Sequence, residues 1–324
     1  MSKALRLLGR RELSVLVLIF VVATIVSCID LSFLSTTNLR DILVRSAPTA
    51  IVACGVMLVV VTGEIDISVG SLMALLAAVL GLSLSRSHFA LPSSVGLLLV
   101  LFLGTTTGWL TGVLVTIGRV PSIMATLGLL TALRGSTTLV MRGGNIQGLP
   151  DGLTSWTKQG VYGIPLSVWT AGLVILVTAW IIHRMPLGRR IYAVGSSPHS
   201  AAMAGLSVGR VKRFVFAYTG FLTALATIVD VPRLPQIEAG IGIDLELLVV
   251  TCVVVGGVSI TGGRGTLTGV TLAVLLMTMI RPMLTFLAVG ESGEKWTKAI
   301  QGMFILLAVV ADHGFGRRSK REVG

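Results

Sequence analysis

Long apolar stretches recur along almost the whole chain, and they constrain its fold more than any other feature. Ten of them lie near residues 13–34, 46–61, 69–84, 95–117, 120–139, 167–183, 214–231, 245–258, 267–288 and 299–311. A helix that crosses a bilayer needs about 20 mostly apolar residues, because the hydrocarbon layer is roughly 30 Å thick and each residue rises 1.5 Å. Several runs are shorter than this, so each is either a full span, a buried half-helix or a re-entrant segment.

The composition excludes an ordinary soluble domain. Of the 324 residues, 53% are hydrophobic and 12% are charged, and the mean hydropathy is +0.92. One soluble core cannot bury so much apolar surface. The sequence therefore predicts an all-α fold: a single polytopic membrane domain over residues 1–324, with about ten transmembrane helices.

The basic residues predict the orientation of this bundle, because Lys and Arg are retained on the cytoplasmic side of a membrane. With the N-terminus inside, ten crossings leave 16 of the 26 basic and five of the 14 acidic residues on the inner side, a net charge of +11 out of +12. The cytoplasmic segments are then 1–12, 184–213 and 312–324, and both termini face the cytoplasm. The basic pI near 10.6 is explained by anionic lipid headgroups rather than by nucleic acid.

The first apolar run also resembles a lipoprotein signal that would be cleaved before Cys28. Removal of this run would place the basic C-terminus outside, against the charge rule, so we expect a retained first helix. The three cysteines, Cys28, Cys54 and Cys252, all lie in apolar runs with no His nearby. They are expected to pack in the bundle, and we predict no metal site.

The first of two glycine-rich interruptions is "TGEIDISVGS", residues 62–71. Its Gly63 can make a turn, and Asp66 and Ser68 can cap the helix that begins near Val69. Alternatively, Gly63, Glu64, Asp66 and Ser68 line a water-accessible gate, because acids within a membrane usually face the interior of the bundle. Both interpretations require that protein or water, and never lipid, shields the free backbone groups.

The second interruption is "GGVSITGGRGTLTG", residues 256–269, which contributes four further candidates for the pathway or gate: Gly256, Gly257, Gly262 and Gly263. Residues 46–139 and 214–311 each supply four apolar runs with one such break. Short spans interrupted by glycine in two halves are typical of internally repeated transporter folds, so we predict an internal repeat.

Three glycines in the run 95–117, Gly104, Gly108 and Gly112, recur at four-residue spacing. They form a stripe of small residues along one helix face, which lets another backbone approach closely. We predict helix packing at this stripe, within the subunit or against a second copy.

The large inner loop, residues 184–213, is basic at both ends and mildly polar between them. Pro198 can open a short helix that Gly205 ends, and Ala201, Ala202 and Met203 would form its small exposed apolar face. Such a helix can dock into a groove on a partner protein, or it can rest on lipid.

Motifs for chemistry are missing from the sequence. There is no G-x-x-x-x-G-K-[ST] phosphate loop, no G-x-S-x-G and no H-E-x-x-H, and the four His lie near loops or chain ends. We expect no enzymatic activity and no cofactor in this chain.

Four stretches in the same order resemble the membrane permease of bacterial ABC importers of the ribose or simple-sugar class. They are "TGEIDISVGS" (62–71), "VPSIMATLGLLTALRG" (120–135), "LGRRIYAVGSSPHSAAMAGLSV" (187–208) and "VVVGGVSITGGRGTLTGV" (253–270). The sequence departs from the family's pattern at Glu64, where Gly is common, at Ser196–Ser197, and in the outer segment 227–247.

This resemblance implies a permease of the bacterial inner membrane that works as a homodimer or a heterodimer. It implies two cytoplasmic ATPase subunits that carry ATP and Mg²⁺, and a periplasmic binding protein that delivers a sugar or sugar-like ligand. It also implies that the loop around 197–206, including Ser197, is the coupling helix that docks on the ATPase. No residue discriminates among the sugars that such permeases carry.

Two alternatives remain at this point. A self-sufficient secondary transporter would use Glu64 and Asp66 as its proton or cation site. A membrane-embedded scaffold protein would transport nothing.

Overall fold

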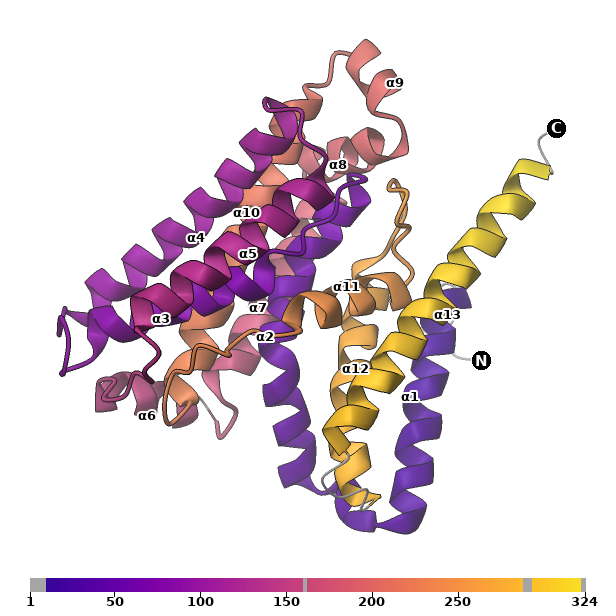
Figure 1. The fold of residues 1–324 in the computed structure, drawn as a ribbon. Coiled ribbons are helices and arrows are strands. Elements are labelled where there is room, and N and C mark those ends of the chain that lie inside the picture. The colour runs from indigo at the N-terminus through magenta and orange to yellow at the C-terminus, as the bar shows by residue number, and fades with distance from the viewer. Residues whose placement is uncertain (1–9, 160–161, 288–292, 322–324) are drawn as a thin grey trace.

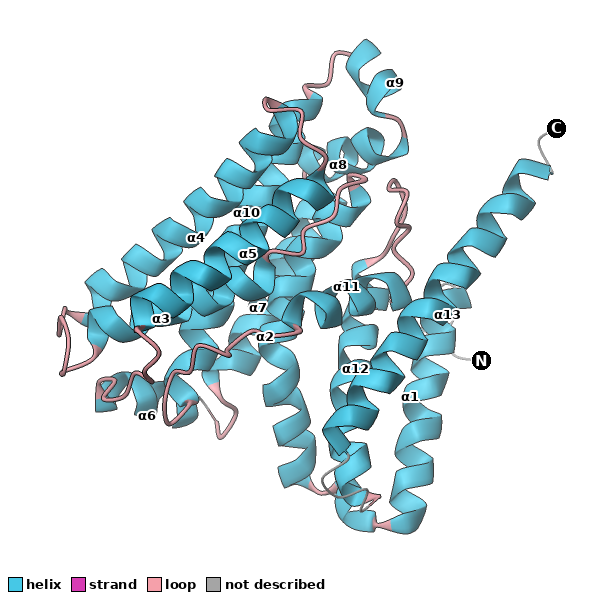
Figure 2. Cartoon of the chain, in the orientation of Figure 1, coloured by secondary structure: helices cyan, strands magenta, loops and turns pink. Residues whose placement is uncertain are grey.

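The computed structural model describes residues 10–159, 162–287 and 293–321, and it is built from helices (Figures 1 and 2). Residues 1–9 of the predicted cytoplasmic N-terminus and 322–324 of the predicted tail lie outside the described residues. The elements in chain order are α1 (Arg10–Ile29), η2 (Leu31–Leu34), α2 (Thr36–Val61), α3 (Val69–Leu84), α4 (Ser93–Thr116), α5 (Ser122–Met141), α6 (Asp151–Gln159), α7 (Leu166–Arg184), α8 (Pro186–Ser196), α9 (Pro198–Met203), α10 (Val208–Asp230), η3 (Val231–Arg233), α11 (Leu245–Val255), α12 (Leu267–Phe286) and α13 (Gly293–Arg321).

Each of the ten apolar runs overlaps a different α-helix, although the run 13–34 continues past α1 into η2 and the run 245–258 extends beyond the end of α11. Among the described residues, seven helices are long and apolar enough to cross a membrane: α1, α2, α4, α5, α7, α10 with η3, and α12. The helices α3 and α11 are apolar but shorter, with 16 and 11 residues. The apolar run 46–61 is shorter than the helix that contains it, because α2 begins ten residues earlier, at Thr36, and continues through Pro48.

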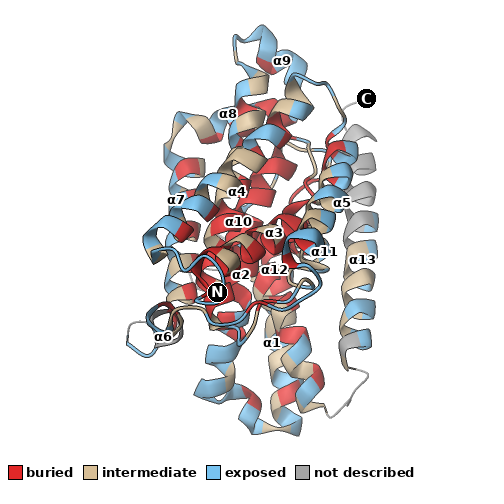
Figure 3. Ribbon diagram, turned by 60° about the vertical axis from the view of Figure 1, so that its left-hand side comes forward, coloured by how far each residue is buried: buried red, intermediate tan, exposed pale blue. Residues whose placement is uncertain are grey.

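The helix α2 lies at the centre of the bundle. In its most apolar 18-residue stretch 94% of the residues are buried, against 67% in α10 and 56% in α12. The outer helices α1, α4, α5 and α7 are buried over only 17–33% of their windows. They expose large apolar side chains such as Phe20, Phe102 and Leu176. Figure 3 shows this arrangement, with buried residues in the middle of the bundle and exposed ones at its ends and flanks. These outer faces are suited to contact with lipid hydrocarbon, because large apolar side chains are unfavourable in contact with water.

The helices α4 and α10 pack closely against each other along the glycine stripe. A Cβ on Gly104 would lie 2.6 Å from the Gly220 carbonyl oxygen, one on Gly108 would overlap the Phe216 carbonyl oxygen, and one on Gly112 would lie 2.8 Å from the Arg213 Cα. The stripe therefore packs within one subunit. Because the side chain of glycine is a single hydrogen atom, the two backbones can approach closely.

We expect Gly108→Ala to destabilise the protein by about 1–3 kcal/mol, because the added methyl group overlaps a backbone oxygen that cannot rotate away. Gly135→Ala on α5 is the matched control, since a Cβ there meets nothing within 4 Å. The measurement is the thermal midpoint in detergent by size-exclusion chromatography. Equal midpoints for the two variants would contradict the tight α4–α10 contact.

The chain returns into the bundle between α10 and α11. Ile237 forms a short antiparallel bridge with Ile146, and the Arg134 guanidinium on α5 donates to the carbonyls of Ala239 (3.2 Å) and Ile241 (2.9 Å). A Cβ on Gly242 would overlap the Gly70 carbonyl at the start of α3. Segment 234–244 therefore leads the chain from the end of α10 to the start of α3, where the short helix α11 begins.

Candidate coupling site

Three segments that are far apart in sequence meet backbone to backbone beside α8. Gly263 N donates to the Val61 carbonyl at the end of α2 (2.8 Å), and a Cβ on Gly195 near the end of α8 would overlap the same oxygen. A Cβ on Gly262 would lie 2.9 Å from both Gly63 N and the Gly195 carbonyl oxygen. We call these five residues, Val61, Gly63, Gly195, Gly262 and Gly263, the glycine junction. It ties both predicted interruptions to the predicted docking loop.

Positive φ angles explain why glycine occupies three of these positions. Gly63, Gly262 and Gly263 have φ of +79°, +86° and +73°, a region that side chains with a Cβ rarely adopt. Gly257 also has a positive φ (+89°), whereas Gly256 is required for space, since its Cβ would lie 2.6 Å from the Val270 Cα on α12. The loop 256–266 is thereby folded back between α11 and α12.

Several polar groups of the interruption 62–68 have partners within the protein. Asp66 is buried, and its carboxylate accepts from the backbone N–H of Ser68 (2.9 Å) and from the Ser68 hydroxyl (2.7 Å), directly before α3. Ser68 occupies the N-cap position of α3, but the predicted capping hydrogen bonds to the helix are wrong for both side chains, because the Ser68 hydroxyl donates to Asp66 and Asp66 accepts, among the described residues, only from Ser68. On the other side, Ile65 N donates to the Ser122 hydroxyl on α5 (3.1 Å), which fixes the segment against that helix.

Glu64 forms an ion pair with Lys212 near the start of α10. The two side chains are 13% and 16% exposed, so most of the pair is removed from water. Glu64 is therefore paired with a cation, and Asp66 is held by two hydrogen-bond donors from Ser68.

Two further contacts hold the loop 256–266. The Tyr192 hydroxyl on α8 donates to the Gly265 carbonyl (2.8 Å), and burial raises the pKa of Tyr192 above its usual value, which keeps the hydroxyl protonated. Thr266 caps α12 by accepting from Gly269 N (3.3 Å), and its hydroxyl donates to Glu12 near the start of α1 (2.6 Å). The loop is therefore held from α8 and from α1.

The helix α9 begins at Pro198, as predicted, and projects from one end of the molecule next to α8 (Figure 1). The Ser197 hydroxyl accepts from Ser200 N (3.2 Å) as its N-cap, and Gly205, with φ of +80°, follows its end. Ala202 and Met203 are exposed, the latter to 80%. The predicted exposure of Ala201 is wrong, since Ala201 is buried on the face that packs against the bundle.

Gly195, Tyr192, Lys212, Glu12 and Thr266 belong to this site but were not predicted from the sequence. Gly195 had a visible signal, because it lies in one of the stretches that carry the family resemblance. Lys212 had none, because it is separated from Glu64 by 148 residues and is one of several cations in a basic loop.

No cluster of three or more His, Cys, Asp or Glu suited to a metal ion occurs among the residues that the structure describes. Of the three cysteines, Cys54 and Cys252 are buried and Cys28 is exposed.

Comparisons with known proteins show which family the chain resembles. Residues 38–309 match a protein family described as the permease component of the branched-chain amino acid transport system. The chain is 35% identical to the ribose import permease protein RbsC of Haemophilus influenzae over 309 residues, 94% of each chain, and 35% identical to that of Escherichia coli K12 over 302 residues, 92% of each. It is 34% identical to the autoinducer 2 import system permease protein LsrC of Photorhabdus laumondii over 306 residues, 94% of this chain and 90% of the relative. No solved structure matches it significantly.

Proposed function

The chain belongs to this family of ABC-transporter permease components, and from that premise we propose which solute it moves and how. It is the permease subunit of an ATP-driven sugar importer, a transport subunit rather than an enzyme, and ATP hydrolysis lies with a separate ATPase. Its solute in our proposal is a monosaccharide or sugar-like molecule. Ribose is the first to test, because it is the solute named for two relatives.

In the proposed topology the chain crosses the bacterial inner membrane ten times. Both termini, the α8–α9 loop and the tail after residue 312 face the cytoplasm, in keeping with the net charge of +11 on that side. Helices 46–139 and 214–311 form two repeated halves, each with one non-helical break. A second copy or a paralogue completes the pathway, and a periplasmic binding protein, which importers of this class employ, delivers the sugar.

The glycine junction is the observation that supports the mechanism best. The exposed tip of α9 follows directly after α8, and α8 contacts both breaks through its backbone at Gly195. Packed backbones shift as units rather than deform, so a displacement of α9 by the ATPase is transmitted to the ends of α2 and α11–α12. The proposed roles are therefore docking for α9 and gating for the two breaks. ATP and Mg²⁺ bind to the partner ATPase.

Uptake by reconstituted vesicles tests this function. Vesicles that contain the permease, its ATPase and the binding protein should accumulate radiolabelled ribose or another pentose only when ATP is present on the ATPase side. Omission of the ATPase is the control and should abolish uptake. Accumulation driven by an ion gradient without ATPase would contradict the proposal and favour a secondary transporter.

We expect Ala202→Arg to prevent co-purification of the ATPase, because a bulky side chain on the exposed tip blocks a close protein contact. Gly205→Trp should have the same effect, with the added strain of a side chain at a φ of +80°. Ala90→Arg is the matched control, since Ala90 is exposed in the loop at the other end of the bundle. Membrane insertion of all variants is checked by fluorescence of a fused reporter. Complex formation that survives both α9 substitutions would contradict the docking role.

A further inference from the structure

Helix α1 carries a buried carboxylate, although it is one of the most exposed helices of the bundle. Only 17% of its apolar stretch is buried, whereas Glu12 near its start is 8% exposed. A carboxylate loses hydration when it is buried, and this cost is offset only where the group gains hydrogen bonds. The burial of Glu12 therefore points to a specific contact with the rest of the protein.

That contact is with the residue directly before α12. The Thr266 hydroxyl donates to Glu12 Oε1 at 2.6 Å, across 254 residues of sequence. The same hydroxyl oxygen accepts from Gly269 N (3.3 Å) and so caps α12. A hydroxyl has one proton and two lone pairs. Because the proton is directed to Glu12, a lone pair is left to face the N–H of Gly269, and Glu12 thereby orients the cap of α12.

The loop in front of Thr266 is held by two other helices. Gly263 N donates to the Val61 carbonyl at the end of α2 (2.8 Å). The Tyr192 hydroxyl of α8 donates to the Gly265 carbonyl (2.8 Å). Gly265 has a φ of +155°, which residues with a Cβ rarely adopt, so the backbone next to Thr266 has unusual conformational freedom. The hydrogen bond from α1 therefore holds the loop at the point where it enters α12.

Helix α1 is placed to hold α12 as well as the loop. The two helices pack along each other (Figure 1), and they begin at the same end of the bundle, since Glu12 and Thr266 lie near their starts. Packed helices shift as units rather than deform. A displacement that reaches Thr266 therefore moves α1 and α12 together, as long as the hydrogen bond keeps the first turn of α12 closed.

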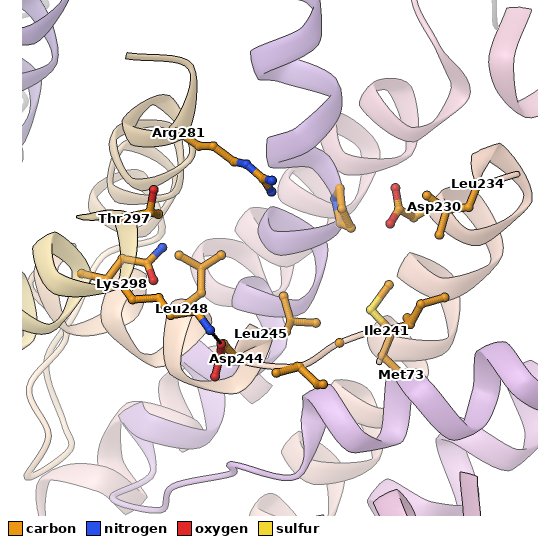
Figure 4. A pocket seen from close by; sticks show the side chains of 14 residues that line it. Met73, Asp230, Leu234, Ile241, Asp244, Leu245, Leu248, Arg281, Thr297 and Lys298 are labelled. Carbon is orange, nitrogen blue, oxygen red and sulfur yellow. Dashed lines mark ion pairs between the residues drawn. The ribbon is translucent and has the colours of Figure 1, made fainter. Parts of the chain in front are cut away.

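The other helix that borders this loop, α11, has a more exposed polar contact. Asp244, directly before α11, forms an ion pair with Lys298 of α13 (2.8 Å) on the wall of a hollow (Figure 4). The Asp244 and Lys298 side chains are 42% and 57% exposed, so water screens their attraction and the pair contributes little. This pair therefore provides a control for the buried contact of Glu12.

We propose that Glu12 is a positioning residue for coupling: it orients the Thr266 hydroxyl and thereby joins the loop 256–266, α12 and α1 into one body. The coupling role rests on the proposed import function, in which the ATPase displaces α9 and α8. With the cap in place, the displacement that enters the loop through Gly265 continues into α12. Without the cap, the loosened first turn of α12 absorbs the displacement, and ATP is hydrolysed with less solute imported.

Hydrogen exchange of the purified permease tests the cap without any transport. We expect Glu12→Leu, which fills a similar space, to speed exchange of the Gly269 amide about fivefold, the factor that corresponds to a lost helix cap of about 1 kcal/mol. Glu12→Gln should exchange like the wild type, because its side-chain carbonyl still accepts from Thr266. Thr266→Val removes the hydroxyl and should match Glu12→Leu. Exchange at the wild-type rate in Glu12→Leu would overturn the proposal.

The sugar imported per ATP hydrolysed tests the coupling role in the reconstituted system. We expect Glu12→Leu to lower this ratio about threefold or more, while its ATPase still co-purifies and hydrolyses ATP. Glu12→Gln should restore the ratio. Lys298→Met is the control and should keep the wild-type ratio, because its ion pair is exposed. A wild-type ratio in Glu12→Leu, or a Glu12→Gln ratio as low as that of Glu12→Leu, would contradict the proposal.

The outcomes separate the two proposals. Failure of the wild-type complex to import any sugar with ATP would refute the import function, while hydrogen exchange would still report on the cap. Import by the wild type together with an unchanged ratio in Glu12→Leu would refute the coupling role of Glu12 alone.

Discussion

Gly195→Ala is expected to destabilise the permease by at least about 2 kcal/mol, although the same substitution in an ordinary helix stabilises it by up to about 1 kcal/mol. The sign reverses because the added Cβ would overlap the Val61 carbonyl oxygen and would lie 2.6 Å from Gly263 N. Both neighbours are backbone atoms of the glycine junction, so no side chain can rotate away. The measurement is the thermal midpoint of the purified protein in detergent.

Gly209→Ala is the matched control for this prediction. Gly209 lies in the first turn of α10, and a Cβ there would be 3.6 Å from the Thr116 Cβ, an ordinary contact. We expect this variant to unfold at or slightly above the wild-type temperature. If Gly195→Ala behaves like Gly209→Ala, the three segments of the junction do not meet as described.

The second large effect concerns the ion pair between Glu64 and Lys212. Lys212→Met should destabilise the protein by about 3 kcal/mol, because it leaves a mostly buried carboxylate without its cation. The double variant Glu64→Gln with Lys212→Met removes both charges and should recover most of this loss. Denaturation of the three proteins by guanidinium in the same detergent measures the difference.

An exposed pair serves as the control here. Arg86 and Asp151 are 75% and 91% exposed, and breaking such a pair costs at most about 1 kcal/mol. We expect Arg86→Met to stay within that range. A Lys212→Met protein as stable as the double variant would show that the charge on Glu64 is solvated, and the burial of the pair would then be wrong.

The apolar helices were predictable because each depends on local sequence. A run of apolar residues forms a helix wherever it lies in a membrane domain, and the glycines at 63, 257, 262 and 263 mark backbone turns that few other residues allow. The same local logic predicted the start of α9 at Pro198. The start of α2 was placed too late because Asp41 and Arg45 interrupt its apolar pattern.

The remaining features depend on contacts between distant segments. Whether Ala201 is buried depends on which face of α9 turns toward the bundle, and a six-residue helix carries too little periodicity to show this. The partner of Glu64 and the approach of Gly195 to Val61 follow from packing across more than 130 residues of sequence.

The central claim is that the ATPase, docked at α9, drives solute movement through the glycine junction. The most direct measurement is the number of sugar molecules imported per ATP hydrolysed in single-orientation vesicles, for the wild type and for Ala202→Arg. The account predicts a fixed ratio for the wild type and no import for Ala202→Arg, although that protein is inserted and folded. Sugar import that continues in Ala202→Arg, or in the wild type without ATP, would contradict it.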